Sequence, residues 1–315
     1  MTAKSTSSLV VLGATGFLGK NLLGVGHLPL PLKAVSRKIP PDADLTQKGV
    51  TWFAADLLSS KSLSGVLESG DIVVNLAYLS GTQSANVRLI DNVIQECFHS
   101  RVSRLIHCST ATVVGATHTT CVDESTPCEP TKPYEQAKLN LERRVLSAGR
   151  GGLDVGIVRP TAIVGPGGKN LAKLAHDLRR RRHMVNYLRA CLFGTRPMHL
   201  VPVETVAAAL LYLALLPEPL NGNIYMVSSD DDPDNNFARI EELLSLALGL
   251  EPRRMPLLPV PRVALRLMLR ILGRSETNTS RVYDGGKLRT VGFEQIHSVA
   301  NAVSRFGTTL QSYHP

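Results

Sequence analysis

The sequence has few of the features that mark metal-binding, secreted or membrane-spanning proteins. Its five cysteines are scattered, none is paired as Cys-x-x-Cys, and no His-x-x-His lies near them, so we expect no structural zinc site. The first residues, MTAKSTSSL, lack the apolar core of a signal peptide. The longest apolar run, 206–216, is too short to cross a bilayer. These absences predict a reduced, cytoplasmic protein.

Acidic residues are outnumbered by basic ones. The 315 residues include 35 Lys and Arg but only 26 Asp and Glu, a net charge of +9. This excess favours an anionic partner, such as a phosphorylated small molecule, a nucleic acid or an acidic membrane surface; a basic solvated surface explains it equally well. Since no aromatic residues are interleaved with the basic runs and no nucleic-acid-binding module is recognised, we expect no nucleic-acid binding.

Short apolar runs alternate with segments of helical length in the first half of the chain. The predicted helices include 86–98 and 133–146. The runs that predict strands are 9–12, 32–35, 50–54, 72–76, 105–108 and 155–158. Such alternation predicts an α/β fold with a doubly wound parallel sheet that is covered on both faces.

Three glycines follow the first predicted strand in VVLGATGFLGK, and a helical pattern begins within them. Glycine provides the backbone freedom for a tight turn and leaves no Cβ where a ligand approaches, while a helix N-terminus offers free N–H groups to a phosphate. In this strand–turn–helix context the spacing predicts a dinucleotide site. The residues expected to bind the cofactor here are Gly13, Thr15, Gly16, Phe17, Leu18 and Gly19.

The end of the second predicted strand indicates which dinucleotide is bound. An acidic residue there would bind a ribose 2′-OH, but the chain has Ser36, Arg37 and Lys38. A hydroxyl beside a guanidinium suits a 2′-phosphate, so we expect NADP(H) in preference to NAD(H), unless the basic pair only begins a solvated loop. Asp56 and Leu57, after the third strand, are expected at the adenine edge; Asp56 could equally cap a following helix.

Hydroxyl side chains end the fifth predicted strand in HCSTATVVG, and Tyr134 and Lys138 follow in PYEQAK. Four residues apart on a helix, the tyrosine and the lysine share one face. A nearby ammonium favours the phenolate and so lowers the pKa of a tyrosine from about 10 toward the range useful for proton transfer. A Ser or Thr hydroxyl from the neighbouring strand can then hold the substrate oxygen.

These motifs resemble those of the extended short-chain dehydrogenases/reductases, in the NAD(P)-dependent epimerase/dehydratase group of nucleotide-sugar epimerases and reductases. The resemblance covers about the first 170 residues, in family order and with family spacing. It extends more loosely into VPVETVAAAL and GNIYMVSSDD. The segments that carry it are GATGFLG, ADL, GDIVVNLA, STATVVG, PYEQAK and VRPTAIVGPGG.

The resemblance implies roles for individual residues. Tyr134 would be the acid/base, Lys138 would assist it and hold the nicotinamide ribose, and Thr110, or Ser109 beside it, would polarise the carbonyl. A homodimer formed through the helix that carries the tyrosine is also implied. Further cofactor contacts are expected from Leu76, Ala77, Asn86, Pro160 and Thr161.

The pattern changes after Gly165, where a glycine-rich turn leads into a basic segment, 171–184, expected to be helical. A strand-like segment, 223–229, is expected to return to the sheet. We therefore expect a Rossmann-type NAD(P)-binding domain over 1–165, with its sheet completed by about 197–230, and a smaller, mainly helical substrate-binding part formed by 166–196 and 231–315.

The chain departs from the family pattern where relatives bind a nucleotide diphosphate. Met198 replaces the usual arginine, and Ala162 stands where an asparagine is common. Arg196 could substitute, and Arg179, in a run of four arginines over 179–182, and Asn170 are further candidates for substrate binding, although most of the run could be solvated. The arginines at every fourth position of 262–274 predict a basic amphipathic helix that could touch an anionic membrane or pack on the sheet domain.

We therefore expect an NAD(P)-dependent oxidoreductase or epimerase that acts on a nucleoside-diphosphate sugar, in cell-surface polysaccharide synthesis. Hydride transfer would occur at a sugar carbon while Tyr134 moves the proton. Two alternatives remain: oxidoreduction of a non-sugar carbonyl or alcohol, supported by the missing arginine and asparagine, and a non-catalytic NAD(P)-binding protein. No metal is expected.

Overall fold

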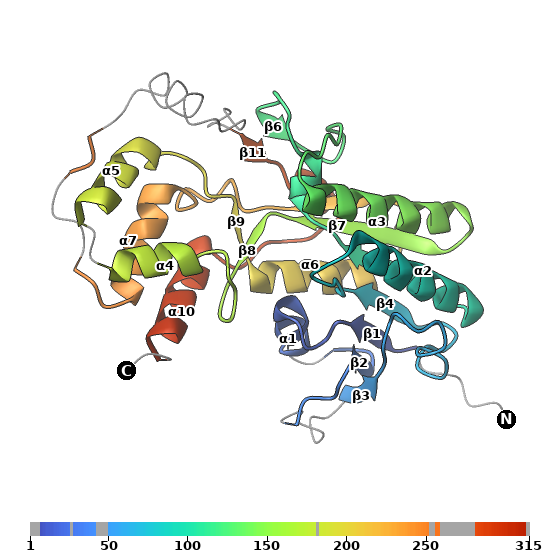
Figure 1. Ribbon diagram of the computed structural model, residues 1–315. Coiled ribbons are helices and arrows are strands. Elements are labelled where there is room, and N and C mark those ends of the chain that lie inside the picture. Colours follow the sequence, from blue (N-terminus) through green and yellow to red (C-terminus); the bar gives the residue numbers. More distant parts are fainter. Residues whose placement is uncertain are drawn as a thin grey trace. The chain divides into compact units, whose positions relative to one another are not determined.

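In the computed structural model, the structure describes residues 7–25, 28–41, 50–180, 183–251, 256–258 and 281–312 (Figure 1). The chain forms two compact units, and each has a hydrophobic core of its own. Unit 1 consists of residues 1–113, 130–159 and 207–225. Unit 2 consists of residues 114–129, 160–206 and 226–315.

Unit 1 is built on a seven-stranded sheet in the order β10-β7-β5-β4-β1-β2-β3. Every described pairing among β1 to β5 and β7 is parallel, and Leu9 lies opposite both Leu32 and Ile72. The strand order reverses between β1 and β4, so the carboxyl ends of these two strands flank the topological switch point. The strands are β1 (Leu9–Leu12), β2 (Leu32–Ser36), β3 (Val50–Ala54), β4 (Ile72–Asn75), β5 (Arg104–Cys108), β7 (Asp154–Pro160) and β10 (Ile224–Val227).

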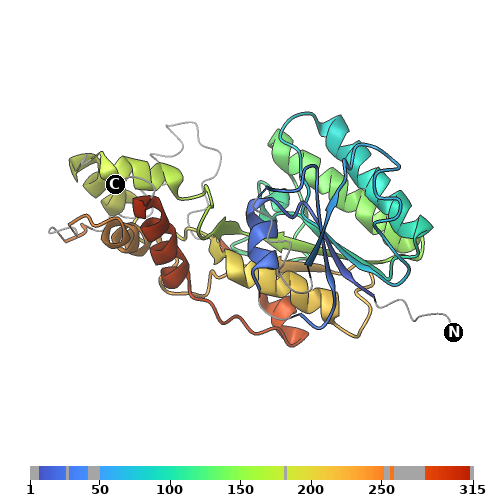
Figure 2. The same cartoon turned by 90° about the horizontal axis from the view of Figure 1, so that it is seen from below.

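Helices cover both faces of this sheet, as the apolar strands require. The two views show α2 (Gln83–His99) and α3 (Pro133–Arg150) on one face and α1 (Phe17–Leu23) and α6 (Val203–Leu215) on the other (Figures 1 and 2). The predicted α/β fold with a doubly wound parallel sheet is confirmed. The buried core includes Val10, Leu12, Ile90, Val93, Leu105, Leu141, Val145 and Ile157.

Unit 2 has a mainly helical core, in which residues of α4, α7 and α10 pack together with β8 and β9. Its helices within the described residues are α4 (Ala172–Arg179), α5 (His183–Phe193), α7 (Phe237–Ala247), α9 (Gly286–Thr290) and α10 (Val299–Ser312). Its two small sheets pair β8 (Ala162–Val164) with β9 (Leu200–Pro202) and β6 (Cys121–Val122) with β11 (Val282–Tyr283). A short 3-10 helix, η1 (Ala111–Val114), begins in unit 1 and ends at the first residue of unit 2.

The helix predicted over 171–184 is not continuous. The structure has α4 ending at Arg179 and α5 beginning at His183. Arg181, Arg182 and the basic helix predicted over 262–274 lie outside the described residues. None of the helices in the described ranges combines the length and the apolar character needed to cross a membrane.

Candidate active site

The glycine turn after β1 is shaped by close backbone contacts. Gly13 has φ +84°, and a Cβ there would lie 3.0 Å from the Ala77 nitrogen. A Cβ on Gly19 would lie 2.5 Å from the Gly13 carbonyl oxygen, closer than real side chains come. Glycine at these two positions therefore lets α1 and the segment after β4 pack onto the turn.

The same turn suits the pyrophosphate of a dinucleotide. Gly16 is the N-cap of α1, no side chain caps this helix end, and its first turn holds no acidic residue. The first backbone N–H groups of the helix are thus left for an anion. Thr15 and Gly16 are exposed, whereas Leu18 and Gly19 are buried, and Phe17 lies between these extremes. Binding of the cofactor by these residues stays a prediction.

The ends of β2 and β3 carry the residues expected at the adenosine half of the cofactor. Ser36 is buried, and its hydroxyl donates to the Lys38 carbonyl at 2.7 Å, so it stabilises the turn after β2. Arg37 is exposed at this turn. Asp56 is also exposed and accepts from the Leu58 N–H at 3.1 Å, which makes it the first residue of a turn rather than a helix cap.

Two buried asparagines fix the loop after β4, where Leu76 and Ala77 were predicted to contact the cofactor. Asn75 accepts from the Ala77 N–H at 3.1 Å, and its amide nitrogen lies 3.2 Å from Nδ1 of His107. Asn86, predicted near the cofactor phosphates, accepts from the Leu79 N–H at 2.8 Å and donates to the Leu79 carbonyl at 2.9 Å. Its side chain thus positions the loop.

The end of β5 and the first turns of α3 bring the predicted catalytic groups together. Lys138 donates from Nζ to the Cys108 carbonyl at 3.1 Å, immediately before Ser109 and Thr110. The Ser109 hydroxyl is buried without a hydrogen-bond partner among the described residues. The Thr110 hydroxyl lies 3.2 Å from that of Thr112.

A second tyrosine, which the sequence reasoning missed, belongs to this group. The Tyr78 and Tyr134 rings meet edge to face, with centroids 5.4 Å apart. The Lys138 ammonium lies 4.6 Å from the centroid of the Tyr78 ring. No motif marks Tyr78, because an aromatic residue after a strand is common in ordinary cores.

The pKa values in this cluster follow from burial. Burial, with smaller contributions from Cys108 and Tyr78, raises the pKa of Tyr134 to about 12, although 47% of the residue's surface is exposed. Burial also lowers the pKa of Lys138, whose ammonium contacts Cys108 and Tyr78. The expectation that Lys138 lowers the pKa of Tyr134 is therefore not met in this structure, and the phenol is protonated at neutral pH.

The residues predicted to bind substrate lie in unit 2. Arg179 donates to the Leu310 carbonyl at 2.9 Å, and Asn170 donates to the Ile163 carbonyl at 2.7 Å, so both side chains take part in local structure. The backbone N–H of Arg196 donates to the Phe193 carbonyl, and its carbonyl accepts from the Phe237 N–H. Their roles in binding stay predictions.

Pro160 and Thr161, which were predicted to contact the cofactor, also belong to unit 2. Pro160 is the last residue of β7. Thr161 follows it and donates from its backbone N–H to the Val227 carbonyl at 3.0 Å. The structure thus shows a backbone hydrogen bond at Thr161, and cofactor contact by Pro160 and Thr161 stays a prediction.

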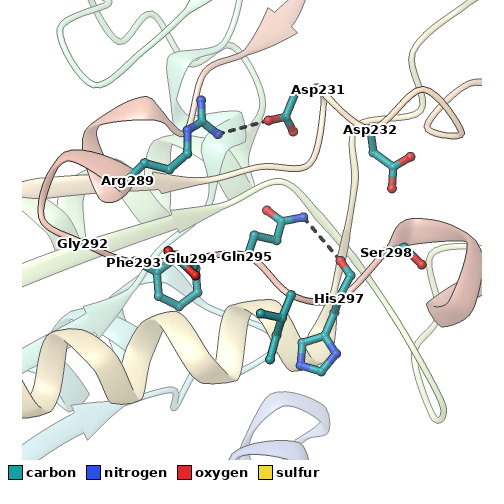
Figure 3. A pocket seen from close by; sticks show the side chains of 10 residues that line it. Asp231, Asp232, Arg289, Gly292, Phe293, Glu294, Gln295, His297 and Ser298 are labelled. Atoms are coloured by element: carbon teal, nitrogen blue, oxygen red, sulfur yellow. Dashed lines mark hydrogen bonds and ion pairs between the residues drawn. The ribbon is translucent and has the colours of Figure 1, made fainter.

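Unit 2 also has a surface hollow of about 750 Å³ between the ends of α9 and α10 (Figure 3). Some of its charged groups already have partners: Arg289 pairs with Asp231 at 3.1 Å, and Asp232 accepts from the backbone N–H of Val299 at 3.0 Å. None of the predicted site residues lines it. The lining residues are Asp231, Asp232, Arg289 and 292–298.

Comparison with known proteins identifies the family. The model of the NAD dependent epimerase/dehydratase family matches residues 9–228. The chain belongs to this family.

Relatives in the family differ in what they act on. A UDP-glucose 4-epimerase of Dictyostelium discoideum is 27% identical over 42% of this chain and 45% of its own length. Sterol demethylase protein B of Methylococcus capsulatus is 29% identical over 70% of this chain and 69% of its own length. A 2-alkyl-3-oxoalkanoate reductase of Stenotrophomonas maltophilia is 30% identical over 71% of each chain.

Solved structures agree on the fold. A UDP-galactose 4-epimerase has a TM-score of 0.72 at 18% identity, over 98% of this chain and 99% of its own. RMD from Pseudomonas aeruginosa, complexed with NADPH, has a TM-score of 0.67 at 20% identity, over 98% of this chain and 100% of its own. At these identities the similarity concerns the fold alone.

Proposed function

We propose that this protein is an NADP(H)-preferring oxidoreductase that interconverts a ketone and a secondary alcohol on a non-sugar substrate. The observation that carries the proposal is the cluster of Tyr134, Lys138 and the hydroxyls after β5, in the unit that also carries the glycine turn. This cluster has the three groups that proton transfer at a carbonyl oxygen needs: a proton donor, a cation and a hydrogen-bond donor.

Each group has a separate task. The bound nicotinamide supplies or accepts the hydride at the substrate carbon. Tyr134 passes its phenol proton to the carbonyl oxygen in reduction and takes it back from the alcohol in oxidation. Thr110 or Ser109 donates a hydrogen bond to the same oxygen. Lys138, one helical turn from Tyr134, would hold the ribose of the nicotinamide when the cofactor is bound.

Tyr134 carries the proton that reduction of a carbonyl requires. Since burial raises the pKa of Tyr134 to about 12, the phenol carries its proton at neutral pH and is ready to donate it. Arg37, exposed directly after β2 and followed by Lys38 where an acidic residue would bind a ribose 2′-OH, supports NADPH as the matching cofactor. Solved relatives carry either cofactor, so the fold itself accommodates both.

Two observations favour a non-sugar substrate. Met198 stands in the place of the family's phosphate-binding arginine and packs against the core of unit 2. Arg179 donates a hydrogen bond from its guanidinium to the Leu310 carbonyl. The relatives that match 70% or more of this chain include the sterol demethylase protein and the oxoalkanoate reductase, whereas the epimerase matches only 42%.

A nucleoside-diphosphate sugar is the second candidate. It is favoured by the net charge of +9, by Arg196 and by the similarity to the UDP-glucose 4-epimerase. A role in polysaccharide synthesis would follow only from this candidate.

The test compares both substrate classes with the wild-type protein. NADPH oxidation is measured with 2-alkyl-3-oxo acids and with 3-ketosteroids, and calorimetry measures binding of UDP, GDP and dTDP. We expect turnover with an oxo acid or a ketosteroid and no binding of a nucleoside diphosphate at millimolar concentration. Binding of UDP with conversion of a UDP-sugar, and no turnover of the ketones, would establish the second candidate instead.

The cofactor preference has its own test. Replacing Arg37 with Asp puts a carboxylate where a 2′-phosphate would bind, so the ratio of NADP⁺ to NAD⁺ affinity should fall by tenfold or more. Lys20→Asp, on the exposed side of α1, is the control for a simple change of charge. If Arg37→Asp leaves the ratio unchanged, Arg37 is an ordinary loop residue.

A further inference from the structure

We propose that Tyr78 is a positioning residue of the active site, whose ring face holds the Lys138 ammonium and whose edge-to-face contact orients Tyr134. The proposal rests on the function proposed above and adds a residue to it that no motif of the chain marks. The two contacts, 4.6 Å from Nζ to the ring centroid and 5.4 Å between ring centroids, place one side chain against both groups.

The loop that carries Tyr78 is held on both sides of it. The residue before it, Ala77, donates its N–H to Asn75, and the residue after it, Leu79, exchanges two hydrogen bonds with Asn86. Both asparagines are fully buried. A ring held in this way is pre-organised against Lys138 and Tyr134 rather than placed there by a flexible loop.

Lys138 needs such a partner because it is buried without a carboxylate. In the described part of the chain its ammonium forms no ion pair: of the acids on its own helix, Glu135 is bound to Lys132 at 3.2 Å and Glu142 to Arg159 at 2.7 Å. The Cys108 carbonyl is its hydrogen-bond acceptor, and the Tyr78 ring face adds the attraction of its quadrupole. Without the ring face, only the Cys108 carbonyl and the charge of Glu142 would oppose the effect of burial on the ammonium.

The other groups around Lys138 do not replace the ring. His107 and the Cys108 thiol come from β5, Tyr134 and Glu142 from α3, and Tyr78 from the loop after β4. His107 and Cys108 are neutral at pH 7, because burial lowers the pKa of His107 to about 3 and raises that of Cys108 to about 11. The charge of Glu142 favours the charged form of Lys138, and the direct contacts of the ammonium that do so are the Cys108 carbonyl and the aromatic face of Tyr78.

The decisive comparison is between Tyr78→Leu, which removes the ring, and Tyr78→Phe, which keeps it and removes only the hydroxyl. A cation–π contact in a desolvated site corresponds to about 3- to 30-fold in a rate or equilibrium constant. We expect kcat of Tyr78→Leu to lie about 3- to 30-fold below that of Tyr78→Phe, with KM for the cofactor alike in both. Phe98→Leu, an exposed aromatic on α2, is the matched control outside the site.

A second readout needs neither cofactor nor turnover. The rate at which trace acetic anhydride labels Lys138 is followed against pH by mass spectrometry in the cofactor-free protein, and its midpoint reports the pKa of the amine. The midpoint should fall in Tyr78→Leu and stay higher in Tyr78→Phe, since only the former loses the ring face. The alkaline limb of the rate–pH profile should move in the same direction.

The outcomes separate this inference from the proposed function. If the wild-type protein turns over none of the substrates but the labelling midpoint still falls in Tyr78→Leu, the positioning role stands and the substrate assignment fails. If Tyr78→Leu and Tyr78→Phe have the same midpoint and the same kcat, the role of the ring face is overturned. Equal losses in both variants would assign the effect to the hydroxyl and overturn it as well.

Discussion

Tyr134 lies at the centre of the candidate site, where its phenol is the group that we propose exchanges a proton with a substrate oxygen. The Tyr134→Phe variant removes the proton but keeps the ring and its contact with Tyr78. We expect turnover to fall by at least a hundredfold, as loss of a general acid/base does, with cofactor affinity within about twofold of wild type. Steady-state kinetics and cofactor titration check this.

Tyr212→Phe, on α6, is the matched control for loss of a phenol elsewhere in unit 1. If Tyr134→Phe keeps more than a few per cent of the activity, the acid/base has been assigned to the wrong residue.

His107 lies beneath the site and titrates far from its usual range. Burial, reinforced by the charge of Lys138, lowers the pKa of His107 to about 3 in the folded protein, whereas the unfolded chain binds this proton near pH 6.5. Protons therefore favour the unfolded state below pH 6.5. The stabilising contribution is fully present above pH 6.5 and is lost as the pH falls toward 3.

The prediction is a difference in pH dependence between two variants. Between pH 7 and pH 5, His107 should account for a loss of about 2 kcal/mol in the free energy of unfolding. The His107→Gln variant should lack this part of the pH dependence, whatever its stability at pH 7. His99→Gln, at the exposed end of α2, is the control and should keep it. Urea unfolding at pH 7 and pH 5 gives the free energy of unfolding of each protein. If this free energy changes with pH in His107→Gln as it does in the wild type, His107 titrates normally.

At the scale of elements, a buried ion pair joins α3 to β7. Arg159 donates to both carboxylate oxygens of Glu142 at 3.0 and 2.7 Å, and both side chains are almost fully buried. Removing one partner deprives the other buried charge of this ion pair, which costs about 3–5 kcal/mol, whereas removing both leaves neither charge in the core.

We therefore expect Glu142→Met to lower the free energy of unfolding by about 3–5 kcal/mol, and the double variant Glu142→Met/Arg159→Met to lower it by less than the sum of the singles. Arg144→Met is the surface control, because its pair with Asp91 is half-exposed and should be worth at most about 1 kcal/mol. Urea titration measures the wild type, Glu142→Met, Arg159→Met, the double variant and Arg144→Met. Additive losses in the double variant would mean that the two side chains act independently.

The sequence predicts the large elements of the fold but not the small ones. The strands of the sheet are apolar runs, and their predicted bounds differ from the observed ones by two residues at most. The β6–β11 and β8–β9 pairs have two or three residues per strand, too few for any periodic pattern. The break between α4 and α5 was missed because arginine suits a helix interior as well as a helix end.

The site shows the same limit. Tyr134 and Lys138 were predicted because four-residue spacing on a helix is visible in one segment. Tyr78 and the Asn75–His107 contact were not, because they join residues from different strands and loops. Spacing along the chain does not encode which side chains meet across the carboxyl edge of a sheet.

At the scale of the whole molecule, most of the residues expected to bind the cofactor belong to one of the two units, so cofactor binding should stabilise that unit. The residues of the glycine turn, the ends of β2 and β3, and the cluster around Tyr134 all belong to unit 1, which has its own core. The chain has one tryptophan, Trp52 in β3, so tryptophan fluorescence reports on unit 1 alone.

Cofactor binding should therefore move the unfolding transition that Trp52 reports. At 100 times its dissociation constant, a ligand that binds only the native state stabilises it by about 2.7 kcal/mol. With excitation selective for tryptophan, the urea midpoint should rise in NADP⁺ and rise less in NAD⁺ at equal concentration. In Arg37→Asp this order should reverse, because the 2′-phosphate then meets a carboxylate. Adenosine, which lacks the pyrophosphate that the glycine turn suits, is the control and should shift the midpoint little. A Trp52 transition that neither dinucleotide moves at millimolar concentration would show that unit 1 does not bind them, and the proposed oxidoreductase function would fail with it.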